Sequence, residues 1–369
     1  MTTYTHFGAT TTATEVASTF SSQVRGKTIL IVGVSPNSLG QHLVQALVPH
    51  NPYLLILASR SLKNIDSVTS SLSENEKKMV KAVEVDLSSQ SSIRLAANAI
   101  KGLTEKLDLV FNVAAVNVQE KEMTEDGLEM HFGTNYIGFF LLTNLLIPEI
   151  RNAAREKGKT AGETRIVSFT SAGHRLSPIR FSDLNFSKPS SDLPEEERPP
   201  QGLPKAVYDP EKGGYSSFVA YAQSKTGNIL FSVALRERFK KEGILAISVH
   251  PGCECFSIPS MWFYFKGLES KVVANRMADF REAIWTNLAR NLDEEGKEVI
   301  KNTSKAWKTR DQGAATGLVA GLDPALGETE EVYMSDCQFA KAASFATDVS
   351  ISERLWGVSE QLVGQRFIF

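Results

Sequence analysis

A tyrosine and a lysine four positions apart are the residues whose types and spacing most directly suggest chemistry. On a helix, Tyr221 and Lys225 would share one face, about one turn apart. A tyrosine alone is a poor acid–base catalyst at neutral pH because its pKa is about 10. A lysine cation close by stabilises the phenolate and lowers that pKa. The pair could therefore exchange a proton with a bound molecule, although the same spacing also occurs on ordinary amphipathic helices.

A glycine-containing turn could hold a phosphate group. It follows the apolar run at residues 28–33 and opens a helical pattern. Gly33 would allow a tight turn, and Gly40 would let helix and strand pack closely, so that the helix N-terminus can bind a pyrophosphate. Asn37 and Ser38 replace the middle glycine of the usual pattern, and asparagine tolerates positive φ better than most residues. By itself the segment could equally be an ordinary strand–helix turn. The candidate phosphate-binding residues are Gly33, Ser35, Asn37, Ser38, Leu39 and Gly40.

The end of the second apolar run suggests which dinucleotide such a turn would bind. An acid at this position binds the ribose 2′-hydroxyl of NAD, whereas an arginine accommodates the 2′-phosphate of NADP. Here the run at 54–59 is followed by Arg60, twenty residues after Gly40, with no acid and with Lys63 close by. A guanidinium can pair with phosphate through two hydrogen bonds. The sequence therefore favours NADP(H), the alternative being that Arg60 is a solvated surface residue.

Six apolar runs alternate with helical patterns and predict the fold. They span residues 28–33, 54–59, 80–87, 107–113, 165–170 and 245–250. Near-continuous apolar strands between helices are typical of a parallel sheet covered on both faces. We therefore expect an α/β fold of the doubly wound Rossmann type, with one domain at residues 26–369 after an N-terminal extension at 1–25.

In this order, the motifs resemble the short-chain dehydrogenase/reductase family, and within it the branch with retinol-dehydrogenase-like and fungal biosynthetic members. The resemblance runs from about Gly26 to the C-terminal segment. Each match is short, but the ordered set is specific. The matches are the turn at 33–40, Asp86, Leu87, Asn112, Val113, Ala114, Ala115, Asn135, Thr170, Ser171, Tyr221, Lys225, His250, Pro251 and Gly252.

The resemblance implies the catalytic roles. Tyr221 would be the general acid in reduction and the general base in oxidation, and Ser171 would hydrogen-bond the substrate oxygen. Lys225 would bind the nicotinamide ribose and lower the pKa of Tyr221. Asn135 would help to hold a water that links Lys225 to solvent. Taken alone, Ser171 could simply end a strand and Asn135 could be a buried, satisfied polar residue.

The resemblance also implies the cofactor contacts. Asp86 would hydrogen-bond the adenine, and Asn112 would pack against the adenosine side, although each alone could be a helix or turn cap. Pro251 and Gly252 would shape the nicotinamide pocket. The further implied contacts are Leu87 and Ala114, together with Tyr221 and Lys225.

Three features depart from the family pattern. Ser171 and Tyr221 lie 50 positions apart, so the polar insertion at residues 187–217 must loop out if they are to converge. The family usually carries a threonine after Pro-Gly that contacts the nicotinamide carboxamide, and here that place falls on Phe256, next to Ser257. With the altered glycine turn, this leaves room for weakened redox activity. The resemblance further implies that the segment 253–310 after Pro-Gly covers the substrate. The aromatic run 261–265 would then be a wall or lid over it, or alternatively a helix buried against the sheet.

Composition excludes several other classes of protein. The chain has 369 residues and a formal net charge of −2, which argues against an electrostatic grip on nucleic acid or an anionic membrane. Cys253, Cys255 and Cys337 are too few for a disulfide framework and have no histidine cluster that would complete a metal site. No signal-peptide pattern is present, and the apolar stretch 136–150 is too short to span a bilayer. We therefore expect a cytoplasmic protein without metal, and a homo-oligomer is compatible with the sequence.

Together these features predict an NADPH-dependent reductase, or in reverse an alcohol dehydrogenase. Its substrate would be a ketone or aldehyde on a bulky, apolar small molecule such as a secondary-metabolite intermediate. Two alternatives stay open, since fold does not fix function. One is a non-redox isomerase, lyase or cyclase that uses Tyr221 as acid–base, and the other is a cofactor-binding protein without turnover.

Overall fold

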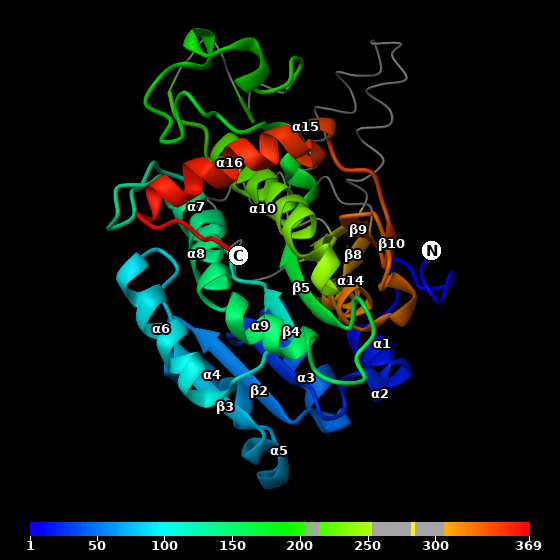
Figure 1. Ribbon diagram of the computed structural model, residues 1–369. Coiled ribbons are helices and arrows are strands. Elements are labelled where there is room, and N and C mark those ends of the chain that lie inside the picture. Colours follow the sequence, from blue (N-terminus) through cyan, green and yellow to red (C-terminus); the bar gives the residue numbers. More distant parts are fainter. Residues whose placement is uncertain (204–206, 209–213, 253–281, 285–305) are drawn as a thin grey trace.

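The computed structural model describes residues 1–203, 207–208, 214–252, 282–284 and 306–369. Its centre is an eight-stranded sheet (Figure 1). The strands are β1 (Thr28–Val32), β2 (Leu54–Ser59), β3 (Val80–Glu84), β4 (Leu109–Asn112), β5 (Thr164–Phe169), β6 (Ile244–His250), β9 (Tyr333–Ser335) and β10 (Gln338–Phe339). They are ordered β10-β9-β6-β5-β4-β1-β2-β3, and all pairs are parallel except β9 with β10.

Side chains of the central strands alternate between two hydrophobic cores, one on each face. On β1, Leu30 and Val32 belong to one core, whereas Ile29 and Ile31 belong to the other. All five β1 residues are buried, as expected for a strand covered on both sides. This arrangement confirms the predicted doubly wound α/β fold.

Helices pack on both faces of this sheet (Figure 1). They are α1 (Ala13–Thr19), α2 (Ser21–Val24), α3 (Leu39–Leu47), α4 (Leu62–Thr69), α5 (Glu74–Lys78), α6 (Gln90–Leu103), α7 (Met130–Phe132), α8 (Gly138–Leu145), α9 (Ile147–Ala154), α10 (Ser217–Phe239), α14 (Arg310–Leu322), α15 (Ser344–Thr347) and α16 (Val349–Leu362). Two short strands, β7 (Glu282–Ile284) and β8 (Ala306–Lys308), pair separately. Among the described residues, no helix is long and apolar enough to cross a membrane.

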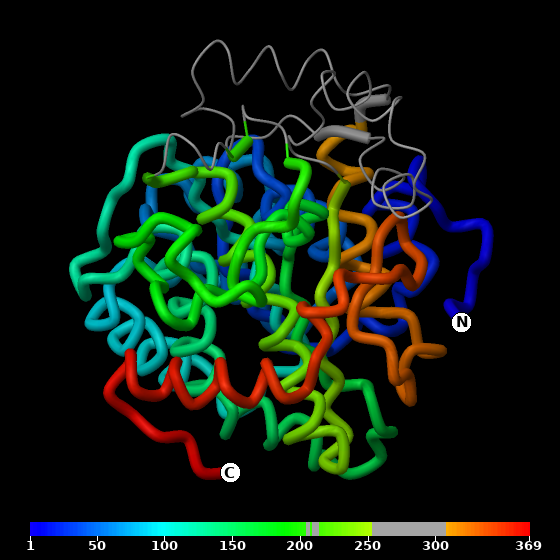
Figure 2. Tube along the Cα trace, turned by 90° about the horizontal axis from the view of Figure 1, so that it is seen from above, coloured from blue at the N-terminus to red at the C-terminus, as the bar shows by residue number. Residues whose placement is uncertain are grey.

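The N-terminal segment, predicted only as an extension, packs on the sheet domain. Val16 and Ala17 on α1 are fully buried in the same core as residues of α3 and α14. Asp323 after α14 accepts the backbone N–H of Thr3 at 2.7 Å. In Figures 1 and 2 this segment accordingly lies beside the part of the chain around α14. Residues 1–25 therefore share a core with the dinucleotide-binding fold.

The polar insertion at 187–217 is anchored more firmly than its composition suggests. Leu193 and Val207 are buried. Arg180, also buried, donates hydrogen bonds to Ser190 (3.1 Å) and to the carbonyl of Lys188 (2.9 Å). These contacts tie the start of the insertion to the body of the molecule, on the side of α10 and α16 (Figure 1). The connection between Ser171 and Tyr221 thus loops outward, and the two segments that carry them can meet.

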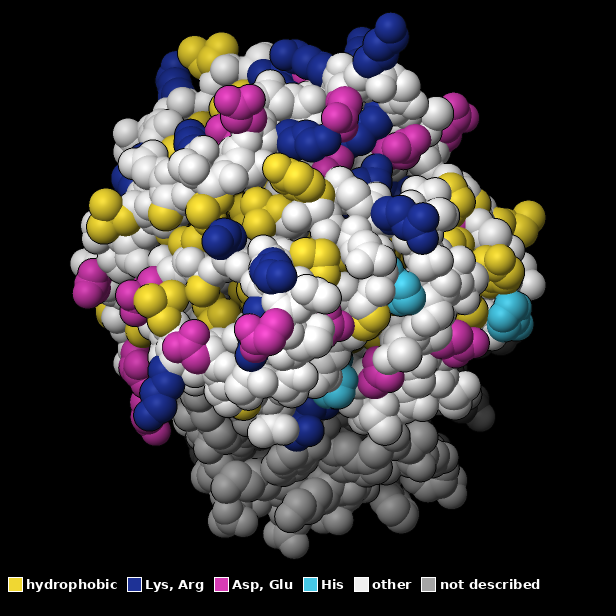
Figure 3. All heavy atoms as spheres, turned by 90° about the horizontal axis from the view of Figure 1, so that it is seen from below, with side chains coloured by type: hydrophobic (Ala, Val, Ile, Leu, Met, Phe, Trp, Pro, Cys, Tyr) yellow, Lys and Arg dark blue, Asp and Glu magenta, His cyan; other side chains and the backbone are white. Residues whose placement is uncertain are grey.

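The predicted substrate-covering region lies mostly outside the described residues. This applies to Phe256 and Ser257, to the aromatic run 261–265, and to Cys253 and Cys255. Cys337 is described and is buried. On the face shown in Figure 3, acidic and basic side chains are interspersed, in keeping with the net charge near zero.

Candidate active site

The glycine turn between β1 and α3 is crowded at both ends. Gly33 has φ +112°, and a Cβ there would lie 2.4 Å from the backbone nitrogen of Ala114. A Cβ on Gly40 would lie 2.2 Å from the carbonyl oxygen of Gly33. Real Cβ atoms do not approach backbone this closely, so any side chain at either position would force the strand and helix apart. The turn is therefore compact enough for its backbone to reach a ligand.

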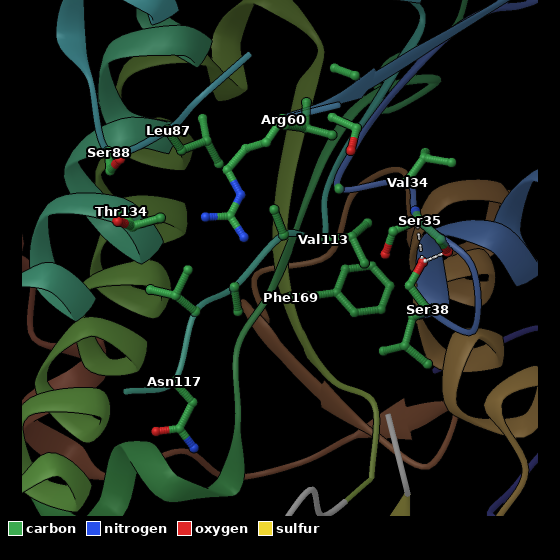
Figure 4. A pocket seen from close by; sticks show the side chains of 18 of the residues that line it. Val34, Ser35, Ser38, Arg60, Leu87, Ser88, Val113, Asn117, Thr134 and Phe169 are labelled. Atoms are coloured by element: carbon green, nitrogen blue, oxygen red, sulfur yellow. Dashed lines mark hydrogen bonds between the residues drawn. The ribbon is translucent and has the colours of Figure 1, made fainter. Parts of the chain in front are cut away.

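Asn37 and Ser38 stand where the usual pattern has its middle glycine, and each contributes to the shape of the turn. Asn37 adopts φ +61°, the left-handed conformation that asparagine tolerates. The Ser38 hydroxyl donates to the carbonyl of Ser35 (2.7 Å) and accepts from the N–H groups of Ser35 and Gln41, both at 3.2 Å (Figure 4). Ser38 thus caps α3 and closes the turn on itself. Among the described residues, the N–H groups of Leu39 and Gly40 are left without an acceptor, as first-turn amides are.

Arg60 lies directly after β2 at the same pocket. Its side chain is exposed and has no ionic partner in the part of the chain that the structure describes. In Figure 4 its guanidinium points into the pocket, between Leu87 and Val113. An unpaired guanidinium beside a phosphate-sized turn is a natural anion site.

Tyr221 and Lys225 both lie on α10 and are 4% and 2% exposed. The Lys225 ammonium lies 5.5 Å from the centre of the Tyr221 ring and donates to the carbonyl of Phe169 at 3.0 Å. The carbonyl of Lys225 accepts from the Thr170 hydroxyl at 2.7 Å. These bonds fix α10 against the end of β5. The cation is therefore held beside the phenol, as the sequence spacing predicts.

Ser171 follows β5 and caps a short 3-10 helix at Ala172–Leu176. Its hydroxyl oxygen accepts the N–H of Gly173 at 3.0 Å, which leaves its own proton to donate. The turn is clamped by two histidines. The carbonyl of Ser171 accepts from Nδ1 of His174 at 2.7 Å, and Nδ1 of His250 accepts the N–H of Ala172 at 3.2 Å.

Both histidines are uncharged. Burial is the main cause that lowers the pKa of His174 and of His250 to about 3 in each case. His174 also accepts the N–H of Ala343 at Nε2, 3.0 Å away, which links the serine turn to the C-terminal segment. Sequence reasoning missed His174. Its position three residues after Ser171 was the only signal, and that spacing alone does not specify a role.

Asn135 lies in a π-helical turn, Gly133–Ile137, and is fully buried. Its side chain accepts the N–H of Val116 at 2.7 Å and donates to the carbonyl of Val116 and to the hydroxyl of Ser224, both at 3.1 Å. Asn135 therefore holds the segment after β4 against α10. It does not line the pocket itself.

One pocket of about 650 Å³ brings most of the candidate residues together. It is lined by Gly33, Ser35, Asn37, Ser38, Leu39, Arg60, Leu87, Ala114, Ser171, Tyr221, Lys225, Pro251 and Gly252. Ser171 and Tyr221 thus reach the same cavity despite the 50 positions between them. This cavity joins the glycine turn to the Tyr221–Lys225 pair.

Four candidate residues lie behind the lining: Gly40, Asp86, Asn112 and Asn135. Asp86 accepts from the N–H (2.9 Å) and the hydroxyl (2.6 Å) of Ser88, so its carboxylate closes a turn. Asn112 donates to the Thr143 hydroxyl at 3.2 Å, and its buried side-chain oxygen has no partner within the described parts of the chain. Direct contact of Asp86 or Asn112 with a cofactor stays a prediction.

The fold and this cavity define a dinucleotide-binding protein with a buried Tyr–Lys pair at the end of its site, and comparison with known proteins specifies the family. Residues 27–177 match the model of the short chain dehydrogenases. The chain is 36% identical over 248 residues to Oxidoreductase fscI of Fusarium equiseti, covering 67% of this chain and 94% of that one. It is 27% identical to Retinol dehydrogenase 12 of Mus musculus, covering 93% and 88%. The chain belongs to the short-chain dehydrogenase/reductase family of oxidoreductases, which confirms the resemblance.

Solved structures show the same fold. The NADPH-bound carbonyl reductase from chicken fatty liver superposes with a TM-score of 0.52 at 17% identity, covering 86% of this chain and 100% of that one. At this identity the likeness concerns the fold alone.

Proposed function

We propose that this protein is an NADP(H)-dependent reductase of a ketone or aldehyde, and in reverse an alcohol dehydrogenase, acting on a bulky apolar small molecule such as a secondary-metabolite intermediate. The observation that carries the proposal is a single cavity lined by Ser171, Tyr221 and Lys225 at one part and by the glycine turn and Arg60 at another. The oxidoreductases and retinol dehydrogenases among its relatives support the same class of reaction.

The residues present fit the cofactor. Leu39, which lines the pocket, and Gly40 behind it form the first turn of α3, and their N–H groups have no acceptor among the described residues. A pyrophosphate at this helix end would be stabilised by the helix dipole. For a 2′-phosphate, Arg60 supplies a guanidinium that has no ionic partner among the described residues, and β2 ends without an acid that would repel the phosphate. These features favour NADP(H) over NAD(H). When bound, the nicotinamide supplies or accepts the hydride.

The side chains supply the proton and hold the reacting oxygen. In reduction, the Tyr221 hydroxyl donates its proton to the carbonyl oxygen of the substrate. Ser171 donates to the same oxygen, since its own oxygen already accepts from Gly173. The phenolate left on Tyr221 is stabilised by the Lys225 cation beside it. In oxidation the same steps run backwards, and Tyr221 is the base.

An apolar substrate is supported by the wall of the pocket. Val116, Val118 and Met130 line it, next to the polar residues Asn117 and Glu122. Such lining buries apolar surface and leaves a few polar groups to orient the reacting oxygen.

The test is NADPH oxidation with a panel of carbonyl compounds, including all-trans-retinal, decanal and 9,10-phenanthrenequinone, by wild type and Tyr221→Phe. We expect turnover by the wild type and a loss of at least about a hundred-fold in the variant, the range for losing a general acid. NADPH affinity, measured by fluorescence, should change by less than about two-fold, because the ring is kept. Near wild-type turnover by Tyr221→Phe contradicts the mechanism. Tight NADPH binding without turnover of any carbonyl favours a non-redox enzyme or a binding protein.

A further inference from the structure

A buried carboxylate and imidazole lie behind the proposed proton donor. Glu129 and His131, at the start of the helical segment that carries Asn135, are both 0% exposed. Oε1 of Glu129 lies 2.7 Å from Nδ1 of His131 and accepts the hydroxyl of Tyr215 at 2.7 Å. Oε2 of Glu129 accepts the N–H of Phe132 at 2.8 Å. Neither Glu129 nor His131 lines the pocket, and the chemistry described so far uses neither.

The hydrogen bonds define the tautomer of His131. Nε2 lies 3.0 Å from the backbone nitrogen of Val118, and an amide N–H can only donate. Nε2 must therefore be unprotonated, and the proton of the neutral ring is on Nδ1, where Glu129 accepts it. The side-chain oxygen of Asn117 is farther from Nε2, at 3.4 Å. His131 is thus a donor on one side and an acceptor on the other.

Glu129 keeps this arrangement in place. Burial alone would raise the pKa of Glu129. The hydrogen bond and electrostatic attraction of His131, with hydrogen bonds from Phe132 and Tyr215, outweigh burial and hold the pKa below its usual value. The carboxylate therefore stays ionised and acceptor-only at neutral pH, so the ring nitrogen facing it must carry the proton. Buried carboxylates are costly unless their oxygens are satisfied, and here both are.

His131 contacts two parts of the site, the ring of Tyr221 and the pocket wall at Val118. The ring of Tyr221 meets it edge to face, with 5.9 Å between the ring centres. Val118, which it binds, is part of the pocket wall. Asn135, four residues on, binds Val116 in the same wall. Asn135 therefore holds Val116, and His131 holds Val118. His131 also supports the ring of Tyr221.

We propose that His131, fixed by Glu129 as its neutral Nδ1–H tautomer, is a positioning residue that holds the Val118 wall and the ring of Tyr221 in their reactive arrangement. The proposal rests on the proposed function of Tyr221 as proton donor. Tyr215 also supports this arrangement, through its hydrogen bond to Glu129. It stands two residues before α10, the helix of Tyr221, and its bond to Glu129 ties the start of that helix to α7.

Two variants separate the hydrogen bond from the ring. His131→Phe keeps a ring against Tyr221 but removes the acceptor for Val118. His131→Gln loses the ring but can place an oxygen near the former Nε2. Ser359→Ala is the matched control, because it removes a buried hydrogen bond (2.7 Å) to Tyr136 on the adjoining π-helical turn, away from the pocket. For all three, the full-length chain is used for carbonyl reduction, NADPH affinity, melting temperature and hydrogen exchange of the peptide that contains Val118.

We expect His131→Phe to lower kcat by at least about ten-fold, the kinetic equivalent of one positioned hydrogen bond. NADPH affinity should be kept, and exchange at Val118 should rise without a general rise elsewhere. His131→Gln should regain most of the protection at Val118 but only part of kcat, because it restores the acceptor and not the ring against Tyr221. Ser359→Ala should lower the melting temperature but keep kcat and Val118 protection.

Three results would overturn the proposal. They are unchanged kcat in His131→Phe, unchanged exchange at Val118 in that variant, or equal losses of kcat in His131→Phe and Ser359→Ala at equal losses of melting temperature. Failure of the proposed function looks different, because Tyr221→Phe then keeps its activity or no carbonyl is reduced. In that case the exchange measurement alone still decides whether His131 holds the wall.

Discussion

The ammonium of Lys225 lies 5.5 Å from the centre of the Tyr221 ring and is held there by the carbonyl of Phe169, to which it donates at 3.0 Å. Both side chains are almost completely buried, so water screens the cation weakly. A cation at this distance favours the phenolate over the phenol. The strength of this effect can be measured through the pH dependence of alcohol oxidation, in which the proposed role of Tyr221 is that of the base.

Lys225→Met should therefore move the rise of the oxidation rate to higher pH. The variant keeps the length of the side chain and removes its charge, so the pKa of Tyr221 should return toward the unperturbed value of about 10. We expect a shift of at least about one pH unit, since an opposite charge typically moves a pKa by one to three units. The measurement is kcat for alcohol oxidation against pH at saturating NADP+. An unchanged profile with lower cofactor affinity would mean that Lys225 only binds the ribose.

Arg60→Asp should reverse the cofactor preference. Its guanidinium is exposed, unpaired within the described residues, and directed into the pocket. A hydrogen bond to a charged group contributes about 1.5–3 kcal/mol, which corresponds to about ten- to a hundred-fold in a binding constant. We expect the ratio of the NADPH and NADH dissociation constants to change by at least this factor. Lys63→Asp is the matched control, because Lys63 is exposed nearby but does not line the pocket. Equal changes in both variants would indicate a general charge effect.

Asn37→Gly should be tolerated and Asn37→Val should not. Asn37 has φ +61°, which costs a residue with a Cβ roughly 1–2 kcal/mol and costs glycine little. The side chain is exposed, so the pair of variants tests the backbone and not packing. We expect Asn37→Val to lower the free energy of unfolding by about that amount and to weaken NADPH binding, while Asn37→Gly stays near wild type. Urea unfolding and NADPH titration measure the two effects, and equal stability of both variants would contradict this account.

The strands could be predicted closely where burial alone determines them. The run 54–59 is β2 itself, and the run 245–250 differs from β6 by one residue. The run 80–87 was predicted too long, because β3 ends at Glu84 and the chain turns where Asp86 binds Ser88. Val85 and Leu87 are buried although the strand has ended, so apolar residues continue past its end and the sequence does not show where it stops. β9 and β10, with three and two residues, are too short to show a period.

The candidate site also has parts that the sequence predicts and parts that it does not. Tyr221, Lys225 and the glycine turn have local spacings that encode their geometry, since one helix or one turn holds each group. The contact between Glu129 and Tyr215 joins residues 86 positions apart, and that between His174 and Ala343 joins residues 169 apart. A single sequence contains no period or spacing that pairs such positions. They could be found only after the fold had brought their segments together.

The two histidines that clamp the Ser171 turn should make the protein less stable as the pH falls below neutral. Burial lowers the pKa of His174 and of His250 to about 3, whereas in the unfolded chain a histidine titrates near 6.5. Between these two pH values, both histidines are protonated in the unfolded chain but stay unprotonated in the folded protein. Stability is therefore fully present above about pH 6.5 and is lost as the pH falls toward 3, by up to about 1.4 kcal/mol per pH unit for each histidine.

His174→Gln should remove one of these two contributions. We expect the slope of the free energy of unfolding against pH to fall by about half a proton at pH 6.5 and by about one proton near pH 5, where carboxylates of the unfolded chain stay mostly ionised. Urea unfolding at several pH values measures that slope. His6→Gln is the control, because His6 is exposed and lies outside the Ser171 turn. The variant should also lower kcat, since the carbonyl of Ser171 loses its donor and the serine turn its link to Ala343. A slope equal to that of the wild type would mean that His174 is protonated in the folded protein, which its acceptance of the Ala343 N–H does not allow.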